Sequence, residues 1–139
     1  MSNTKLVIRS DNLNFLTAVE MIGYLQQSTR PEISMASHQC ARFVNQPMRS
    51  HEREIIRIVR YLNNTKDRGI IFEPDPELGL ECFVDADFAG LCDHDTALED
   101  PSTAKSRSGY IIMYANCPII WASKLQTETA LSTTESEYI

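Results

Sequence analysis

The chain has 139 residues, of which 42% are hydrophobic, so it can bury the core of one ordinary globular domain. Its net charge of -6 is divided unevenly, because residues 1–70 contain 10 Lys and Arg against 6 Asp and Glu, whereas residues 71–139 contain 3 against 13. No apolar run is long enough to cross a bilayer, and the first residues lack the apolar stretch of a secretory signal. We therefore expect a soluble intracellular protein, cytoplasmic or nuclear, without a membrane partner.

A first helix is predicted from Asn14 to Gln27, where apolar residues recur at helical spacing. A second helix is expected to start at Pro31, because proline suits the first helical position. The apolar stripe of this second helix consists of Ile33, Ala36, Cys40 and either Phe43 or Val44.

A third helix is predicted after Ser50, whose hydroxyl can cap its first turn, while His51 is expected to pack or to cap. Its buried stripe should contain Ile55, Ile58, Val59 and Leu62. Four arginines cluster on the opposite side of this helix: Arg49, Arg53, Arg57 and Arg60. This side is either an ordinary solvated surface or a row of phosphate contacts for nucleic acid.

The second half of the chain has the pattern of a small antiparallel sheet. A short strand is expected at Gly69–Phe72, and a proline-rich linker follows it. Three further strands are predicted at Glu81–Phe88, Gly109–Tyr114 and Ile119–Ser123. The last two are joined by a hairpin turn at residues 115–118, and an acidic loop from Leu91 to Ser106 separates the first two.

Two carboxylates lie at the end of the first of these strands. Asp85 and Asp87 alternate with apolar residues and therefore share one face of the strand. Paired carboxylates beside apolar residues favour a bound cation, although a solvated strand edge gives the same pattern. A helix is predicted to begin at Ser132, which can form a capping box with Glu135 and leaves Glu137 free to point toward the strand.

Cysteine and aromatic residues offer weaker alternatives. The four cysteines are scattered: Cys40, Cys82, Cys92 and Cys117. They form no CxxC pair, so we expect reduced thiols, with a Cys92–His94 metal site as the alternative. Tyr110 and Trp121 are expected to pack in the core, with stacking on nucleic-acid bases as the alternative.

Four motifs occur in one order along the second half of the chain, and together they resemble the RNase H region of copia-type retrotransposon polyproteins. The motifs are Asp85–Gly90, Ser106–Tyr110, Pro118–Gln126 and Ala130–Tyr138. Upstream, the segments Ser28–Ile33 and Arg57–Leu62 are similar to the region that joins the reverse transcriptase of that family to its RNase H. The resemblance covers about residues 13–139, which is nearly the whole chain.

The resemblance implies an α/β fold in which a helical connection precedes a truncated RNase H-like domain of three antiparallel strands and the start of a helix. It assigns residues 1–12 to a leader, 13–72 to the connection, 73–80 to a linker and 81–139 to the partial RNase H-like domain. It also implies that Asp85 and Glu137 are catalytic metal ligands and that Asp87 faces the substrate or lies just behind the ligands. The complete enzyme would use Mg²⁺ or Mn²⁺ to cleave the RNA strand of RNA/DNA hybrids.

The remaining carboxylates of that enzyme have no counterpart among residues 81–139. We therefore expect a polyprotein fragment that is incomplete and inactive by itself, with nucleic acid and the rest of the polyprotein as partners. The alternative is a remnant without catalytic activity, which either binds nucleic acid through Arg49, Arg53, Arg57 and Arg60 or has only a structural role.

Overall fold

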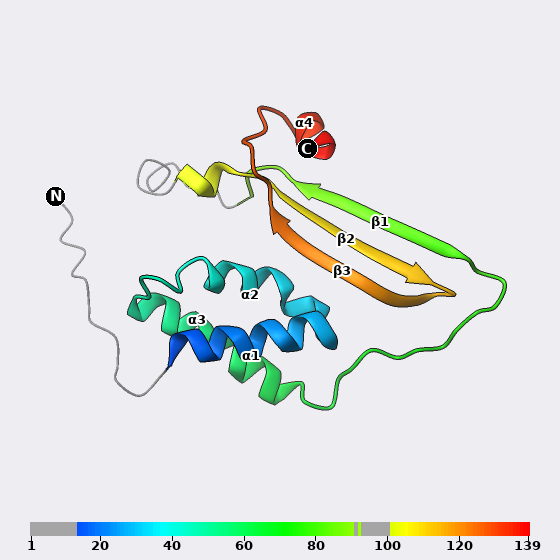
Figure 1. The fold of residues 1–139 in the computed structure, drawn as a ribbon, viewed down its shortest axis with the longest axis horizontal. Coiled ribbons are helices and arrows are strands. Elements are labelled where there is room, and N and C mark those ends of the chain that lie inside the picture. Colours follow the sequence, from blue (N-terminus) through cyan, green and yellow to red (C-terminus); the bar gives the residue numbers. More distant parts are fainter. Residues whose placement is uncertain (1–13, 91, 93–100) are drawn as a thin grey trace. The chain divides into compact units, whose positions relative to one another are not determined.

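The computed structural model describes residues 14–90, 92 and 101–139, and the predicted leader therefore lies outside the described residues. The chain divides into two compact units, Met1–Ile70 and Ile71–Ile139. The first is helical and the second contains the sheet, so the expected mixed α/β composition is confirmed (Figure 1). The predicted linker, residues 73–80, follows shortly after this division.

The first helix, α1, spans Phe15–Ser28 and confirms the prediction for this segment. The side chain of Asn14 caps it, because Asn14 Oδ1 accepts a hydrogen bond of 3.2 Å from the backbone N–H of Thr17. At the other end, the backbone N–H groups of Thr29 and Arg30 both donate to the carbonyl oxygen of Leu25, at 2.9 Å. Both ends of the helix are therefore closed by local hydrogen bonds.

The second helix begins at Pro31, as predicted, but its first turn is the 3₁₀ helix η1, Pro31–Ile33, which continues into α2, Ser34–Ala41. Ile33 and Cys40 are buried as expected, whereas Ala36 is exposed and Ser37 is buried in its place. A 3₁₀ turn has about 3.0 residues instead of 3.6, which rotates the following residues relative to a continuous α-helix. The predicted stripe is therefore wrong at Ala36.

The third helix, α3, spans Arg49–Asn64, with Met48 and not Ser50 at its N-cap, so the cap predicted at Ser50 is wrong. The role predicted for His51 is confirmed, because its Nδ1 accepts a hydrogen bond of 3.1 Å from the backbone N–H of Met48. The ring of His51 also stacks on Phe43, with 3.8 Å between the ring centroids. Partial burial lowers the pKa of His51, which favours the neutral form that can accept this hydrogen bond.

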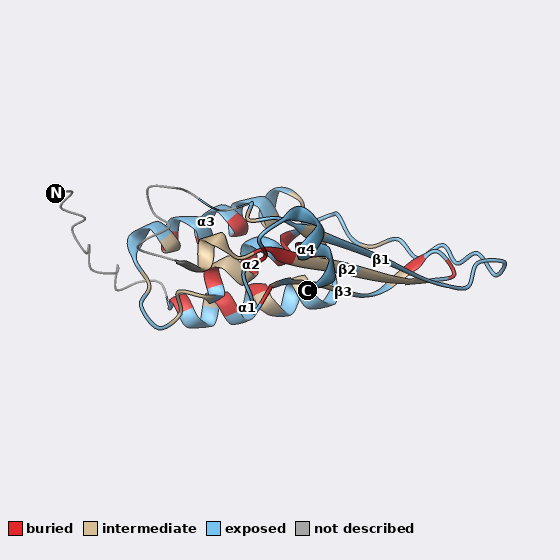
Figure 2. Cartoon of the chain, turned by 90° about the horizontal axis from the view of Figure 1, so that it is seen from above, coloured by how far each residue is buried: buried red, intermediate tan, exposed pale blue. Residues whose placement is uncertain are grey.

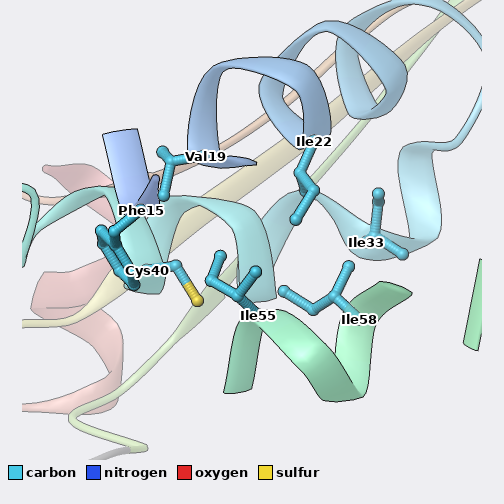
Figure 3. Packing of buried hydrophobic residues seen from close by; sticks show 7 residues of the cluster. All are labelled: Phe15, Val19, Ile22, Ile33, Cys40, Ile55 and Ile58. Carbon is cyan, nitrogen blue, oxygen red and sulfur yellow. The ribbon is translucent and has the colours of Figure 1, made fainter. Parts of the chain in front are cut away.

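The three helices enclose one apolar core, shown in Figure 3. Its buried members are Phe15, Val19, Ile22, Ile33, Cys40, Ile55 and Ile58. Leu62 packs against this cluster as predicted, but Val59 is 50% exposed, so its predicted burial is wrong. The buried stripe of α3 is narrower than expected, because α1 and α2 pack against only one side of this helix.

The sheet has the order β1-β2-β3, with β1 at Leu80–Asp87, β2 at Arg107–Tyr114 and β3 at Cys117–Leu125. Both pairs are antiparallel, and the short helix η2, Pro101–Ala104, precedes β2. The three predicted strands are confirmed, whereas the strand predicted at Gly69–Phe72 is absent from the described structure. Ile71 is 77% exposed, because this apolar run has no neighbouring strand with which to pair.

The hairpin between β2 and β3 turns through two residues, Ala115 and Asn116, with φ of 49° and 64°. Positive φ at both central residues matches the twist of the flanking strands. The predicted turn is therefore confirmed, but it is shorter than expected because Cys117 already belongs to β3. Exposure decreases from β1, which is almost entirely exposed, to β2 and β3, which are mostly half-buried (Figure 2).

The last helix, α4, spans Thr133–Tyr138 and has contacts with β1 and β2. Ser132 Oγ accepts a hydrogen bond of 3.1 Å from Glu135 N, as predicted. The Glu135 carboxylate reaches back to Leu131 N, at 2.7 Å, one residue before the expected Ser132. Within the described residues, none of the helices has the length and apolar character that crossing a membrane requires.

Candidate functional site

The two strand carboxylates lie at the end of β1, where Asp85 pairs with Gly109 and Asp87 with Arg107. Directly opposed residues of a sheet project from the same face, and Gly109 in turn opposes Ser123 of β3. Asp85, Asp87 and Ser123 therefore share one face of the sheet. Both carboxylates are exposed, so water can solvate them without a bound cation.

Asp87 is folded back onto the turn that follows β1. A Cβ atom placed on Gly90 would lie 2.6 Å from both Cγ and Oδ1 of Asp87, which is closer than carbon and oxygen atoms can approach. The same turn contains Ala89 with φ of 47°, and Ala89 N donates to Ser106 Oγ at 3.3 Å. The carboxylate of Asp87 therefore packs on its own turn, and Gly90 provides the space for it.

Glu137 lies on the neighbouring helix α4, which a buried glutamine anchors to the sheet. Gln126 Nε2 donates to Ser108 Oγ at 2.8 Å and to the carbonyl oxygen of Ser136 at 2.6 Å. By strand alternation, Ser108 projects from the face opposite Asp85. A cation shared by Asp85 and Glu137 would therefore have to lie at the free edge of β1, which side chains from either face can reach.

Glu137 faces an open hollow formed by residues of its own helix. This hollow is lined by Thr133, Thr134, Glu137 and Tyr138. Among the residues that the structure describes, no group of three His, Cys, Asp or Glu side chains is placed to hold a metal ion. The described donor set therefore does not fit a two-metal centre, which needs more oxygen ligands than two exposed carboxylates provide.

The cysteines are free thiols. Cys40 and Cys117 are buried, and burial raises the pKa of the Cys40 thiol, which makes it less reactive. Cys82 and Cys92 are exposed. The alternative Cys92–His94 metal site falls on His94, which is outside the described residues.

The four arginines predicted to cluster on α3 are all exposed, and together they form what we call the arginine surface: Arg49, Arg53, Arg57 and Arg60. They lie away from the buried residues Ile55 and Ile58 and extend over about 16 Å of the helix axis. Arg57 Nη1 lies 3.3 Å from Glu54 Oε2, an exposed pair that contributes little to stability. The arginine surface can meet a row of negative charges.

Aromatic residues of the sheet unit are only partly covered. Tyr110 is exposed, so the expectation that it packs in a core is wrong, and Trp121 is half-buried in β3 opposite Ile111. The three described strands are hydrogen-bonded to one another, but many of their side chains on both faces of the sheet are exposed. The alternative role of these rings, stacking on bases, stays a prediction.

One important residue was missed by the sequence analysis. Arg30 is 7% exposed and lies between η1 and the end of α3. Its Nε donates to Glu32 Oε1 at 2.7 Å, Nη1 to the carbonyl oxygen of Thr65 at 3.2 Å and Nη2 to Thr65 Oγ1 at 2.5 Å. The guanidinium also lies 5.7 Å from the ring centroid of Tyr61. Arg30 lies in the segment Ser28–Ile33, which carries part of the family resemblance, but that resemblance did not indicate these contacts.

Comparison with known proteins gives a consistent set of relatives. The chain is 32% identical to a retrovirus-related Pol polyprotein from transposon RE1 of Arabidopsis thaliana, over 99% of its own length and 8% of that protein. It is 35% identical to the Pol polyprotein from transposon TNT 1-94 of Nicotiana tabacum, over 90% of its length and 9% of that protein. It is 34% identical to secreted RxLR effector protein 161 of Plasmopara viticola, over 92% of its length and 84% of that protein.

The chain thus spans less than a tenth of the two Pol polyproteins but most of the third relative. No family profile matches the chain, and no solved structure matches it.

Proposed function

This chain belongs to the same family as secreted RxLR effector protein 161 and is similar to short segments of retrovirus-related Pol polyproteins, and we propose that it carries the first half of an RNase H-like domain preceded by its helical connection. The complete domain would cleave the RNA strand of RNA/DNA hybrids. Residence in the cytoplasm or nucleus is part of the same proposal. The alternative, argued below, is a nucleic-acid-binding remnant without catalytic activity.

One observation carries this proposal: an acidic strand at the edge of an antiparallel three-stranded sheet contacts a helix that begins after the sheet. The strand contributes Asp85 and the helix contributes Glu137. Carboxylates on adjacent elements can contribute to one oxygen-rich cation site if further donors complete it. The described residues do not provide those donors, so we expect no hybrid cleavage by this chain alone.

The proposal can be tested by supplying the missing donors. The RE1 polyprotein residues that follow the matched region would be fused after Ile139, and the fusion would be incubated with a labelled RNA/DNA hybrid and Mg²⁺. We expect cleavage by the fusion but not by the chain alone, and loss of cleavage with Asp85→Asn or Glu137→Gln. Glu81→Gln is the matched control, because Glu81 lies in the same strand and on the same face as Asp85.

Cleavage that survives Asp85→Asn would refute the assigned role of this carboxylate. If circular dichroism shows that the fusion is folded and the fusion still does not cleave the hybrid, nucleic-acid binding without catalysis is the better-supported function. Mg²⁺ can be replaced by Mn²⁺ in the same assay, since both are hard cations that prefer carboxylate oxygens.

The alternative rests on the arginine surface, because four exposed cations on one helix can contact successive phosphates. Binding to a labelled duplex should then weaken as salt increases, and Arg53→Glu should weaken it further. Asp85→Asn should have no effect on binding. Lys124→Glu is a control for net charge, since it makes the same charge change in the sheet unit. Equal binding by Arg53→Glu and Lys124→Glu would refute a specific role for this surface.

A further inference from the structure

The outer edge of β1 has no neighbouring strand among the described residues. β1 stands first in the order β1-β2-β3, so only one of its two edges is paired (Figure 1). Alternate residues of an antiparallel edge strand direct their N–H and C=O groups away from the sheet. Leu80, Phe83 and Val84 are 70, 56 and 67% exposed, so both faces are uncovered along this part of the strand. The edge can therefore accept a further strand.

The two outer strands of the described sheet differ in how they resist further pairing. β3 contains Pro118, which has no N–H to donate, and Lys124, and its register with β2 shifts between Ile112 and Met113. Proline, lysine and irregular pairing are the usual features that prevent an edge strand from accepting another strand. β1 pairs with β2 in continuous register, and it contains neither proline nor lysine. Further pairing is therefore favoured at β1 over β3.

The side chains of β1 specify the kind of strand that fits beside it. By strand alternation, one face is mostly acidic and the other is entirely apolar. The first face carries Glu81, Phe83, Asp85 and Asp87, and the second carries Leu80, Cys82, Val84 and Ala86. Within the described residues, Glu81 and Asp85 are exposed and have no ion pair or side-chain hydrogen bond. A strand with basic residues on one face and apolar residues on the other complements both faces of β1.

A second copy of this chain fits the edge poorly. Directly opposed residues of an antiparallel pair project from the same face, so symmetric pairing centred on Phe83 would oppose Glu81 with Asp85. Symmetric pairing centred on Val84 would oppose Glu81 with Asp87. Carboxylates opposite one another repel, so the acidic face disfavours self-pairing and selects a basic partner strand.

We propose that the outer edge of β1 binds an extended segment of a partner protein in which basic residues alternate with apolar ones. The backbone of this segment pairs with the outward N–H and C=O groups of β1, and this pairing supplies affinity. Its basic side chains lie beside Glu81 and Asp85, and its apolar side chains lie beside Leu80 and Val84. The inference uses only the described sheet, so it does not depend on the proposed nuclease function.

Fluorescence polarisation with the full chain and a short fluorescein-labelled peptide, in which lysine alternates with valine, tests the proposal. One control peptide has the same composition with all lysines before all valines, and the other is the alternating peptide with N-methylated backbone amides. We expect the alternating peptide to bind at least about tenfold more tightly than either control. Glu81→Lys should weaken its binding about threefold or more, because a repulsive cross-strand pair replaces an attractive one. Glu77→Lys makes the same charge change outside the strand and should weaken binding less.

Hydrogen exchange locates the binding site on the chain. The alternating peptide should slow amide exchange within residues 80–87 and leave exchange within β3 unchanged. Equal affinity of the alternating and N-methylated peptides, or unchanged exchange in β1 at saturating peptide, would overturn the proposal. Protection of β1 that increases with the concentration of the chain alone would also overturn it, because a second copy would then occupy this edge.

Discussion

Replacement of Arg30 by methionine tests how the helical unit is held together. The guanidinium of Arg30 connects residues 35 positions apart, because it donates two hydrogen bonds to Thr65 while it pairs with Glu32 next to it. The hydrogen bond to Glu32 raises the pKa of Arg30, so the side chain stays charged at every pH at which the protein is folded. Methionine keeps much of the apolar stem but removes all three hydrogen bonds.

The expected loss follows from these contacts. Two hydrogen bonds from a charged group to Thr65 contribute about 1.5 kcal/mol each or somewhat less, and their loss leaves the carbonyl of Thr65 without this donor. The side chain of Glu32 is 41% exposed, so water can solvate its carboxylate when Arg30 is replaced. The lost ion pair therefore lowers the free energy of unfolding by less than the loss of a fully buried pair would. We therefore expect the free energy of unfolding of the helical unit to fall by about 2 to 4 kcal/mol, a large part of the stability of a small domain.

Urea unfolding followed by far-UV circular dichroism measures this loss. Arg60→Met is the matched control, since Arg60 is an exposed arginine on α3, and it should change stability by less than about 0.5 kcal/mol. Thr65→Val completes a double-mutant cycle, in which we expect a coupling of about 1 kcal/mol with Arg30→Met. If Arg30→Met unfolds at the same urea concentration as the wild-type chain, the clamp between η1 and α3 does not stabilise the unit.

Three further predictions concern individual contacts. Burial lowers the pKa of His51 below 6.5, so the unfolded chain binds a proton more readily than the folded chain does. The stability that the neutral His51 side chain contributes is therefore present above pH 6.5 and is lost as the pH falls below it. His51→Gln should remove this pH-dependent part of the stability, measured as the difference in unfolding free energy from wild type across this range. Gly90→Ala should change the stability of the sheet unit by less than about 0.5 kcal/mol in urea unfolding, because the exposed carboxylate of Asp87 can rotate away from the added methyl. Gln126→Leu should release α4 from the sheet and speed hydrogen exchange at residues 133–138, since it removes the donor to the carbonyl of Ser136.

The features that could be predicted from the sequence depend on local interactions. The boundaries of α1 follow from a capping Asn14 and a helical apolar stripe, and the β2–β3 hairpin follows from its turn residues. The errors occur where local signals compete. Ser50 and His51 both could cap α3, and the imidazole makes the hydrogen bond because it also stacks on Phe43.

Features that depend on distant contacts could not be predicted. The clamp of Arg30 on Thr65 connects two helices, and no periodicity or spacing signals it. The segment Gly69–Phe72 has the composition of a strand, but a strand also needs a partner edge, which composition does not reveal. The assignment of Asp85 and Glu137 to one site stays a prediction, since it rests on the family resemblance and on the contact between β1 and α4.

The distance between residues 85 and 137 tests that assignment most directly. The four native cysteines would first be replaced by serine or alanine. Spin labels would then be attached to two double variants, one with Asp85→Cys and Glu137→Cys and the other with Glu81→Cys and Glu137→Cys, and the distance between the labels would be measured in each. Residues 81 and 85 lie about 13 Å apart along β1, and Gln126 anchors α4 near the Asp85 end of the strand. A clearly shorter distance for the pair 85–137 is the predicted result. An equal or longer distance would place Glu137 away from Asp85 and contradict a shared carboxylate site.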